Sequence, residues 1–253
     1  MRGRTSLRRL AANALGRWRV LPAQEAYALW ADNYPPSPHN PLMRAEQAVM
    51  ASIIHSTSPQ RALDAGTGSG RYLALLASTG ARVVIGVDLS LPMLVSRARD
   101  PRTLSPDLEL GTPGLPTRSV ARVCGDVRRL PFADASFDLI SSSLMVGDVA
   151  DLDGWVSEAA RVLAPGGHLV YSDFHPSWAT RRWRRTFQTA DGRSFEVAYF
   201  PHPLAEHVTA LESRSFEIRA VREPRLTVHD APATLAEGDD VPVAIVFHAV
   251  KPG

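Results

Sequence analysis

The sequence contains very little cysteine and very little lysine. Cys124 is the single cysteine among 253 residues, which excludes an internal disulfide and a cysteine-rich metal cluster. Lys251 is the single lysine, so arginine supplies nearly all of the positive charge. The formal net charge is only +2, which is too small to indicate a nucleic-acid-binding protein.

Long hydrophobic runs are also missing. No run reaches the roughly 18 apolar residues that span a membrane, and arginines interrupt residues 1–20, unlike a signal peptide. This segment has no acidic residue before Glu25, so it could form an amphipathic helix on an acidic surface or a solvated N-terminal helix. With 45% hydrophobic and 21% charged residues, we expect a globular protein of the cytoplasm.

From residue 61 onward, short apolar strands alternate with helical segments, which predicts a parallel α/β sheet. The predicted strands are RALDAG (61–66), RVVIGVD (82–88), ARVCGD (121–126), FDLISSSL (137–144), HLVYSDF (168–174), SFEIRAV (215–221) and VPVAIVFHAV (241–250). Helices are predicted at 71–78, from 92 onward, at 153–163 and at 202–212, and proline-rich residues 100–119 predict an extended loop.

The first 60 residues are expected to form a helical cap or lid. Helical patterns at 23–30 and 42–54 flank a proline-rich stretch. The predicted organisation is therefore a cap of residues 1–60 on a domain of residues 61–253.

The stretch DAGTGSG (64–70) places three glycines between a strand and a helix. Such a loop lets a ligand approach backbone N–H groups. The dinucleotide pattern G-x-G-x-x-G would put its third glycine at 71 rather than at Gly70, and Asp64 would repel a pyrophosphate, so a nicotinamide oxidoreductase is disfavoured. Asp88 ends the next strand, where an acid accepts hydrogen bonds from ribose. A ligand with a ribose, a cationic amine and no phosphate is S-adenosylmethionine.

These motifs resemble those of class I S-adenosylmethionine-dependent methyltransferases, in the style of quinone C-methyltransferases and malonyl-carrier-protein O-methyltransferases. LDAGTGSG resembles the first motif, VIGVDLSLPML the second, GDVRRLPFADASFDLISSSL the adenine strand and fourth strand, and RVLAPGGHLVYSDF the fifth strand. The resemblance covers residues 61–174. It implies a Rossmann-like α/β fold: a seven-stranded, mostly parallel sheet in the order 3-2-1-4-5-7-6, with the last strand antiparallel and helices on both faces.

The resemblance also implies a site for S-adenosylmethionine, released as S-adenosylhomocysteine. Asp64 would lie near the methionine amine, and Asp88 would bind the ribose hydroxyls. The remaining implied contacts are Gly66, Thr67, Gly68 and Gly70 in the loop, Leu89 and Met93 against adenine, Asp126 and Val127 at its ring, Ser142 at the amino-acid end, and Tyr34 closing over the methionine. The sequence also leaves simpler roles open. Asp64 could be a helix-capping acid, Asp88 and Asp126 could be turn residues, and Met93 could be a core residue.

The catalytic residues are left open by the sequence. Transfer from a sulfonium needs a base only where the acceptor must lose a proton. Where the family often has a His-Trp pair, this chain has Gly147 and Asp148. Asp148 could act as a base or be an exposed loop residue, and His175 could take a proton or stabilise a turn.

His39, Trp178 and Arg182 are candidate substrate residues. Arg182 belongs to ATRRWRRTF (179–187), which could bind an acidic acceptor or a carrier protein, or form a solvated helix face. The histidines show no metal-ligand spacing, so no metal site is predicted.

We expect a methyltransferase acting at oxygen, carbon or nitrogen of a small organic acceptor, free or carrier-bound. The alternative is a catalytically silent cofactor-binding regulatory or scaffold protein. The sequence leaves open whether the protein forms a homodimer, and nucleic acid is not an expected partner.

Overall fold

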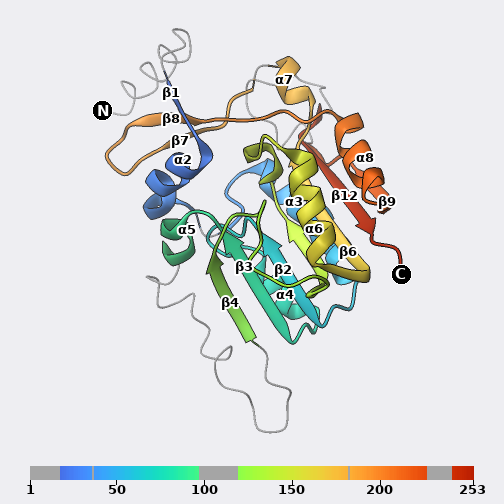
Figure 1. Ribbon diagram of the computed structural model, residues 1–253. Helices are drawn as coiled ribbons and strands as arrows, with labels where there is room; N and C mark the ends of the chain where they lie inside the picture. The colour runs from blue at the N-terminus through green and yellow to red at the C-terminus, as the bar shows by residue number, and fades with distance from the viewer. Residues whose placement is uncertain (1–17, 36, 97–118, 182, 227–240) are drawn as a thin grey trace.

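A seven-stranded sheet forms the centre of the computed structural model, which describes residues 18–35, 37–96, 119–181, 183–226 and 241–253. The strand order is β4-β3-β2-β5-β6-β12-β9 (Figure 1). These strands are β2 (Arg61–Ala65), β3 (Val83–Asp88), β4 (Ser119–Cys124), β5 (Phe137–Ser142), β6 (Leu163–Phe174), β9 (Glu217–Arg222) and β12 (Ala244–Val250). The predicted loop at 100–119 and most of the arginine-rich N-terminus lie outside the described residues.

The sheet has the predicted topology. β2 pairs in parallel with β3 and β5, β3 with β4, and β5 with β6, whereas β12 is antiparallel to both β6 and β9. Numbered along the chain, the strands follow the order 3-2-1-4-5-7-6, which confirms the Rossmann-like prediction. The order reverses beside β2, and in open α/β sheets ligands bind at such a point, outside the carboxyl ends of the strands.

Helices cover both faces of the sheet. They are α3 (Pro41–His55), α4 (Leu73–Ser78), α5 (Leu91–Ser96), α6 (Leu152–Val162) and α8 (Leu204–Ser213). Successive strand side chains point to opposite faces. Ala62 and Leu139 therefore pack with α3 and α4, whereas Leu63 and Ile140 pack with α6 and α8. This alternation buries both faces and holds the carboxyl ends of β2, β3 and β5 in a fixed arrangement.

The cap combines two segments that are far apart in the sequence (Figure 1). Its elements are β1 (Arg19–Leu21), α2 (Ala23–Trp30), η1 (Ala31–Asn33), β7 (Thr186–Gln188) and β8 (Ser194–Val197). β1 pairs in parallel with β8, which is antiparallel to β7. The sequence predicts α2 and α3 but not these strands, because three or four residues are too few to show a two-residue period. The division of the chain at residue 61 stays a prediction.

Several smaller elements differ from the predicted boundaries. β6 begins at Leu163, five residues before the predicted strand, and pairs there with Phe137. The final predicted strand is split into β11 (Val241–Pro242) and β12, and β11 pairs with β10 (Arg225–Leu226). The unpredicted η4 (Val146–Asp148) and α7 (Ser177–Arg181) follow β5 and β6. Within the described residues, no helix has the length and apolar character needed to cross a membrane.

Candidate active site

The glycine loop turns tightly between β2 and α4. Gly66, Gly68 and Gly70 have φ angles of 73°, 55° and 86°, which L side chains rarely adopt. The Gly66 N–H donates to Val87 O at 2.8 Å, which fixes the loop to the end of β3. A Cβ at Gly66 would lie 2.3 Å from Met145 Cγ. Glycine is therefore required there both by the backbone conformation and by the close approach of the segment after β5.

Asp88 ends β3 and faces the same loop. Its Oδ2 accepts a hydrogen bond from the Gly68 N–H and its Oδ1 accepts one from the Ser90 N–H, both at 2.8 Å. Burial raises the pKa of Asp88, while these two backbone donors oppose the shift. Each carboxylate oxygen has capacity for a further hydrogen bond. The group can therefore accept from a ligand that carries paired hydroxyls.

Asp64 is a buried carboxyl in β2, with only 2% exposure. The Ser141 hydroxyl on β5 donates to its Oδ1 at 2.7 Å. Burial raises the pKa of Asp64 to about 6, and this hydroxyl opposes the shift. A cationic group placed beside Asp64 would favour its ionised form. The residue is thus suited to a ligand amine.

A cavity of about 760 Å³ opens beside these residues, near the upper end of the usual range for ligand sites. The predicted residues in its lining are Tyr34, Asp64, Gly66, Thr67, Gly68, Asp88 and Met93 for the cofactor, His39 and Trp178 for the substrate, and Asp148 for catalysis. The fold thus gathers candidates from the cap, the glycine loop and the segments after β3, β5 and β6 around one space.

Other predicted cofactor residues lie outside this lining, namely Gly70, Leu89, Asp126, Val127 and Ser142. Asp126 forms an ion pair with Arg128 at 2.6 Å, and Leu89 is 42% exposed. Ser142 is fully buried. The contacts expected between these residues and a cofactor stay predictions.

His175 also lies outside the cavity lining. Its Nδ1 contacts Ser177 Oγ at 2.9 Å and its Nε2 contacts Glu223 Oε1 at 3.1 Å. Its backbone N–H donates to Val243 O, between β11 and β12. These contacts favour the turn role that the sequence leaves open. Arg182 lies outside the described residues.

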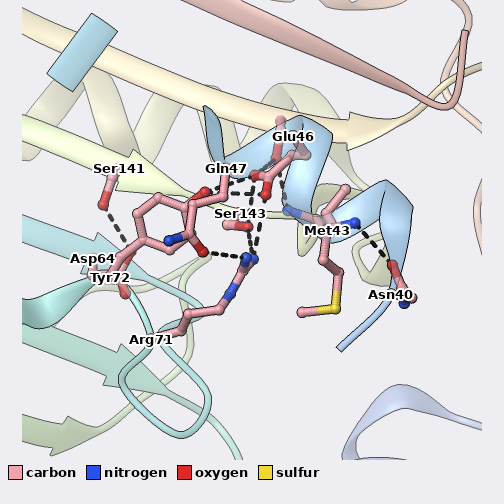
Figure 2. A network of polar contacts seen from close by, with 11 residues as sticks. Asn40, Met43, Glu46, Gln47, Asp64, Arg71, Tyr72, Ser141 and Ser143 are labelled. Atoms are coloured by element: carbon pink, nitrogen blue, oxygen red, sulfur yellow. Dashed lines mark hydrogen bonds and ion pairs between the residues drawn. The ribbon is translucent and has the colours of Figure 1, made fainter. Parts of the chain in front are cut away.

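Glu46 connects helix α3 with the sheet and is fully buried. Figure 2 shows its polar contacts. Its carboxylate accepts hydrogen bonds from the hydroxyls of Tyr72 at 3.0 Å, Ser143 at 2.8 Å and Ser172 at 2.7 Å. Arg71 forms an ion pair with it at 3.4 Å. The sequence gives no signal for this role, because the partners come from three separate segments of the chain, all distant from Glu46 in the sequence.

Arg71 follows the glycine loop, and its side chain lines the cavity with 10% exposure. Its guanidinium donates to Gln47 Oε1 at 2.9 Å and to Ser143 Oγ at 2.5 Å, in addition to the ion pair with Glu46 (Figure 2). These partners hold a positive charge at the cavity wall, where a ligand carboxylate can bind it. The only signal for this role in the sequence is the position of Arg71 directly after the third glycine.

Another part of the wall holds a buried ion pair. Arg185, just before β7, donates to both carboxylate oxygens of Asp148 in η4 and, at 2.6 Å, to the Tyr27 hydroxyl on α2. The two charged side chains are only 8% and 9% exposed. The interpretation of Asp148 as an exposed loop residue is therefore wrong. The segment after β6 covers it, and a contact across 37 positions of the chain leaves no local sequence pattern.

Behind η4, Asp173 of β6 is a fully buried carboxyl group. Its Oδ1 accepts hydrogen bonds from the N–H groups of Gly147 and Phe174, at 3.2 and 2.7 Å. Its Oδ2 lies 3.8 Å from His207 Nε2, and neither atom has a hydrogen-bond partner among the described residues. Burial raises the pKa of Asp173 to about 7 and lowers that of His207 to about 3. Near neutral pH, an uncharged imidazole therefore faces a partly protonated carboxyl group.

We expect Asp173→Asn to stabilise the protein at alkaline pH. A carboxyl group whose pKa is higher in the folded than in the unfolded state stabilises the folded protein at low pH. This contribution is complete below the pKa of the unfolded state, and it is lost as the pH rises through about 7, the pKa in the folded protein. Ionisation then costs the wild-type protein up to about 4 kcal/mol, whereas the amide stays neutral. Urea unfolding at pH 5 and pH 8.5 measures both proteins. A stability difference that does not change with pH would contradict a buried neutral acid.

The sequence matches the family described as "Methyltransferase domain" over residues 63–171, the part that runs from β2 to β6. This part of the chain is a class I S-adenosylmethionine-dependent methyltransferase domain. The resemblance seen in the sequence is thereby confirmed, and S-adenosylmethionine is the cofactor of such domains.

The curated relatives of the methyltransferase domain include methyltransferases named for different acceptors. A demethylmenaquinone methyltransferase of Beutenbergia cavernae is 36% identical over 152 residues, covering 60% of this chain and 53% of that protein. A malonyl-[acyl-carrier protein] O-methyltransferase of Methylococcus capsulatus is 35% identical over 155 residues, covering 60% and 51%. The chain thus spans about half the length of these relatives.

Solved structures extend the similarity beyond the methyltransferase domain itself. An S-adenosylmethionine dependent methyltransferase from Mesorhizobium loti is 25% identical, with a TM-score of 0.60 over 82% of this chain and 98% of that chain. The N-methyltransferase NodS from Bradyrhizobium japonicum, in complex with S-adenosyl-L-homocysteine, is 16% identical, with a TM-score of 0.58 over 85% of this chain and 90% of that chain. This second similarity concerns the fold alone.

Proposed function

We propose that the protein transfers the methyl group of S-adenosylmethionine to a small organic acceptor bound in the same cavity. The observation that carries the proposal is the placement of Asp64, Asp88 and Arg71 in one cavity wall. Asp88 would accept from the ribose hydroxyls, Asp64 would lie by the amine, and Arg71 would bind the carboxylate. This set suits an amino-acid nucleoside better than a dinucleotide, whose pyrophosphate Asp64 would repel.

The chain's own part in the reaction is to orient the two reactants and exclude water. When bound, S-adenosylmethionine supplies a methyl group activated by a sulfonium. Displacement is in line and needs the accepting atom within about 3 to 3.5 Å of the methyl carbon. Gly66 and Gly68 line the cavity with backbone alone, while Tyr34 and Trp30 of the cap line the cavity and shield it. An acceptor that must lose a proton also needs a base.

The curated relatives suggest two acceptor classes, since their names refer to a quinone and to a carrier-bound acyl group. A free small molecule fits the largely apolar and aromatic lining. The proposal also admits an acceptor that is bound to a carrier protein. It is compatible with either a monomer or a homodimer. An assay with methyl-labelled S-adenosylmethionine separates an enzyme from a silent cofactor-binding protein.

Asp88→Ala should weaken S-adenosylhomocysteine binding by about 1.5 to 3 kcal/mol, because it removes charge-assisted hydrogen bonds to the ribose. Isothermal titration calorimetry measures this loss. Asp138→Ala is the matched control, since Asp138 also accepts hydrogen bonds from backbone N–H groups but lies outside the cavity lining. Unchanged affinity in Asp88→Ala would contradict the placement of the ribose.

A further inference from the structure

The ion pair of Asp148 and Arg185 lines the cavity, but neither residue is assigned to the ribose, the amine or the carboxylate of the cofactor. Removing two charges from water costs more than packing apolar side chains of similar size. Arg185 uses three of its five N–H donors on Asp148 and Tyr27, and no further acceptor lies within hydrogen-bond distance among the described residues. The cavity wall therefore has donors and a carboxylate available to a second ligand.

This cluster lies close to the expected methyl donor. Asp148 is three residues after Met145, which occupies the space beside Gly66 in the glycine loop. The charges of Asp148 and Asp88 also influence each other, because Asp148 contributes to the raised pKa of Asp88. An acceptor bound at the cluster would thus sit next to the end of the cofactor.

The surrounding wall is aromatic. From the cap come Tyr27, Trp30 and Tyr34, with 4.8 Å between the ring centroids of Trp30 and Tyr34. From the end of β6 comes Phe174 and from α7 comes Trp178, with ring centroids 4.7 Å apart. Such faces bind flat, apolar rings.

Charge narrows the choice of acceptor group. A cationic amine would be repelled by the sulfonium and by Arg71 and Arg185. A carboxylate would gain little from Arg185, because Asp148 already neutralises that residue. A neutral group with an acidic proton fits best, since it can donate to the Asp148 carboxylate and accept from Tyr27 or Arg185.

We infer that the acceptor is a hydroxylated aromatic compound whose hydroxyl binds at Asp148, Arg185 and Tyr27; this rests on the proposed function. The hydroxyl proton passes to the Asp148 carboxylate, and the oxygen forms a bond to the methyl carbon. The sulfur–methyl bond breaks, with its electron pair remaining on sulfur. The products are an aryl methyl ether and S-adenosylhomocysteine, and Asp148 then releases the proton to water.

Three probes that share one ring system test the inference: 2-naphthol, 2-(aminomethyl)naphthalene, whose amine is cationic at neutral pH, and 2-naphthoate. Calorimetry first measures S-adenosylhomocysteine binding, and then titrates each probe into the loaded protein. We expect 2-naphthol to bind at least tenfold more tightly than the other two. Preference for the amine or the carboxylate, or no binding of 2-naphthol, would overturn the inference. Failure of S-adenosylhomocysteine to bind would instead refute the proposed function itself.

Variants locate the hydroxyl site. Tyr27→Phe should weaken 2-naphthol binding about 3- to 10-fold and leave S-adenosylhomocysteine binding unchanged. Tyr199→Phe is the control and should change neither affinity, because Tyr199 is not among the residues that line the cavity and its hydroxyl donates to the backbone O of Phe174. Equal 2-naphthol affinity in wild type and Tyr27→Phe would count against the site.

Turnover tests the proton transfer. With methyl-labelled S-adenosylmethionine, wild-type protein should methylate 2-naphthol, and Asp148→Asn should reduce the rate by about 10²- to 10⁴-fold. Normal S-adenosylhomocysteine binding would show that Asp148→Asn is folded. If this variant does not fold, the turnover of Tyr27→Phe is measured in its place. Absence of wild-type turnover, or full turnover in Asp148→Asn, would contradict the role of Asp148.

Discussion

Replacing Glu46 with alanine should destabilise the protein by about 3 to 5 kcal/mol, because it leaves buried partners without the carboxylate that pairs with them. Arg71 would keep its charge in the cavity wall, and the hydroxyls of Tyr72 and Ser172 would lose an acceptor. Helix α3 would also lose its polar connection to β6. Urea unfolding monitored by circular dichroism measures the change.

Two further variants show whether burial is the cause. Glu46→Gln keeps the volume and one acceptor oxygen, so its cost should be smaller. Glu25→Ala removes an acid of the same type whose ion pair with Arg19 is exposed to solvent, so it should cost no more than about 1 kcal/mol. If Glu46→Ala were as mild as Glu25→Ala, the network would not hold α3 to the sheet.

Gly66→Ala should abolish measurable cofactor binding and lower stability by several kcal/mol. The left-handed backbone conformation alone costs roughly 1 to 2 kcal/mol with a Cβ, and the contact with Met145 adds overpacking of about 1 to 3 kcal/mol. The loop must move to relieve this contact, and the Gly68 N–H bonded to Asp88 would move with it. Chemical unfolding and titration with S-adenosylhomocysteine measure the two effects.

The chain provides a close control for this substitution. Gly166 has φ of 74°, nearly the same as the 73° of Gly66, but nothing lies within 4 Å of a Cβ placed there. Gly166→Ala should therefore show the backbone cost alone and normal cofactor binding. Equal effects in the two variants would mean that the space beside Gly66 is unimportant.

The sheet and the glycine loop could be predicted because their signals are local. Alternating apolar strands and helices fix the α/β class, and positive φ angles need glycine at 66, 68 and 70. The full strand order, with an antiparallel last strand, came from the family resemblance rather than from the pattern itself. Asp64 and Asp88 could be found because each sits at or near a strand end beside the loop.

The rest of the site depends on contacts between distant segments. Glu46 lies on α3 and meets Ser172 on β6, 126 positions away. Tyr27 and Arg185 meet across 158 positions of the chain, because β1 at the start of the cap pairs with β8, which follows β6. Hydrophobic periodicity reports which face of an element is buried, but it does not report which polar side chain from another segment will be buried with it.

The central claim is that S-adenosylmethionine binds where β2 and β3 end, held by acids. A crystal structure of the protein with S-adenosylhomocysteine tests it most directly. We predict that the ribose hydroxyls lie within hydrogen-bond distance of the Asp88 carboxylate, with the homocysteine amine beside Asp64 and its carboxylate at Arg71. A ligand bound elsewhere, or a ribose that does not contact Asp88, would contradict the account.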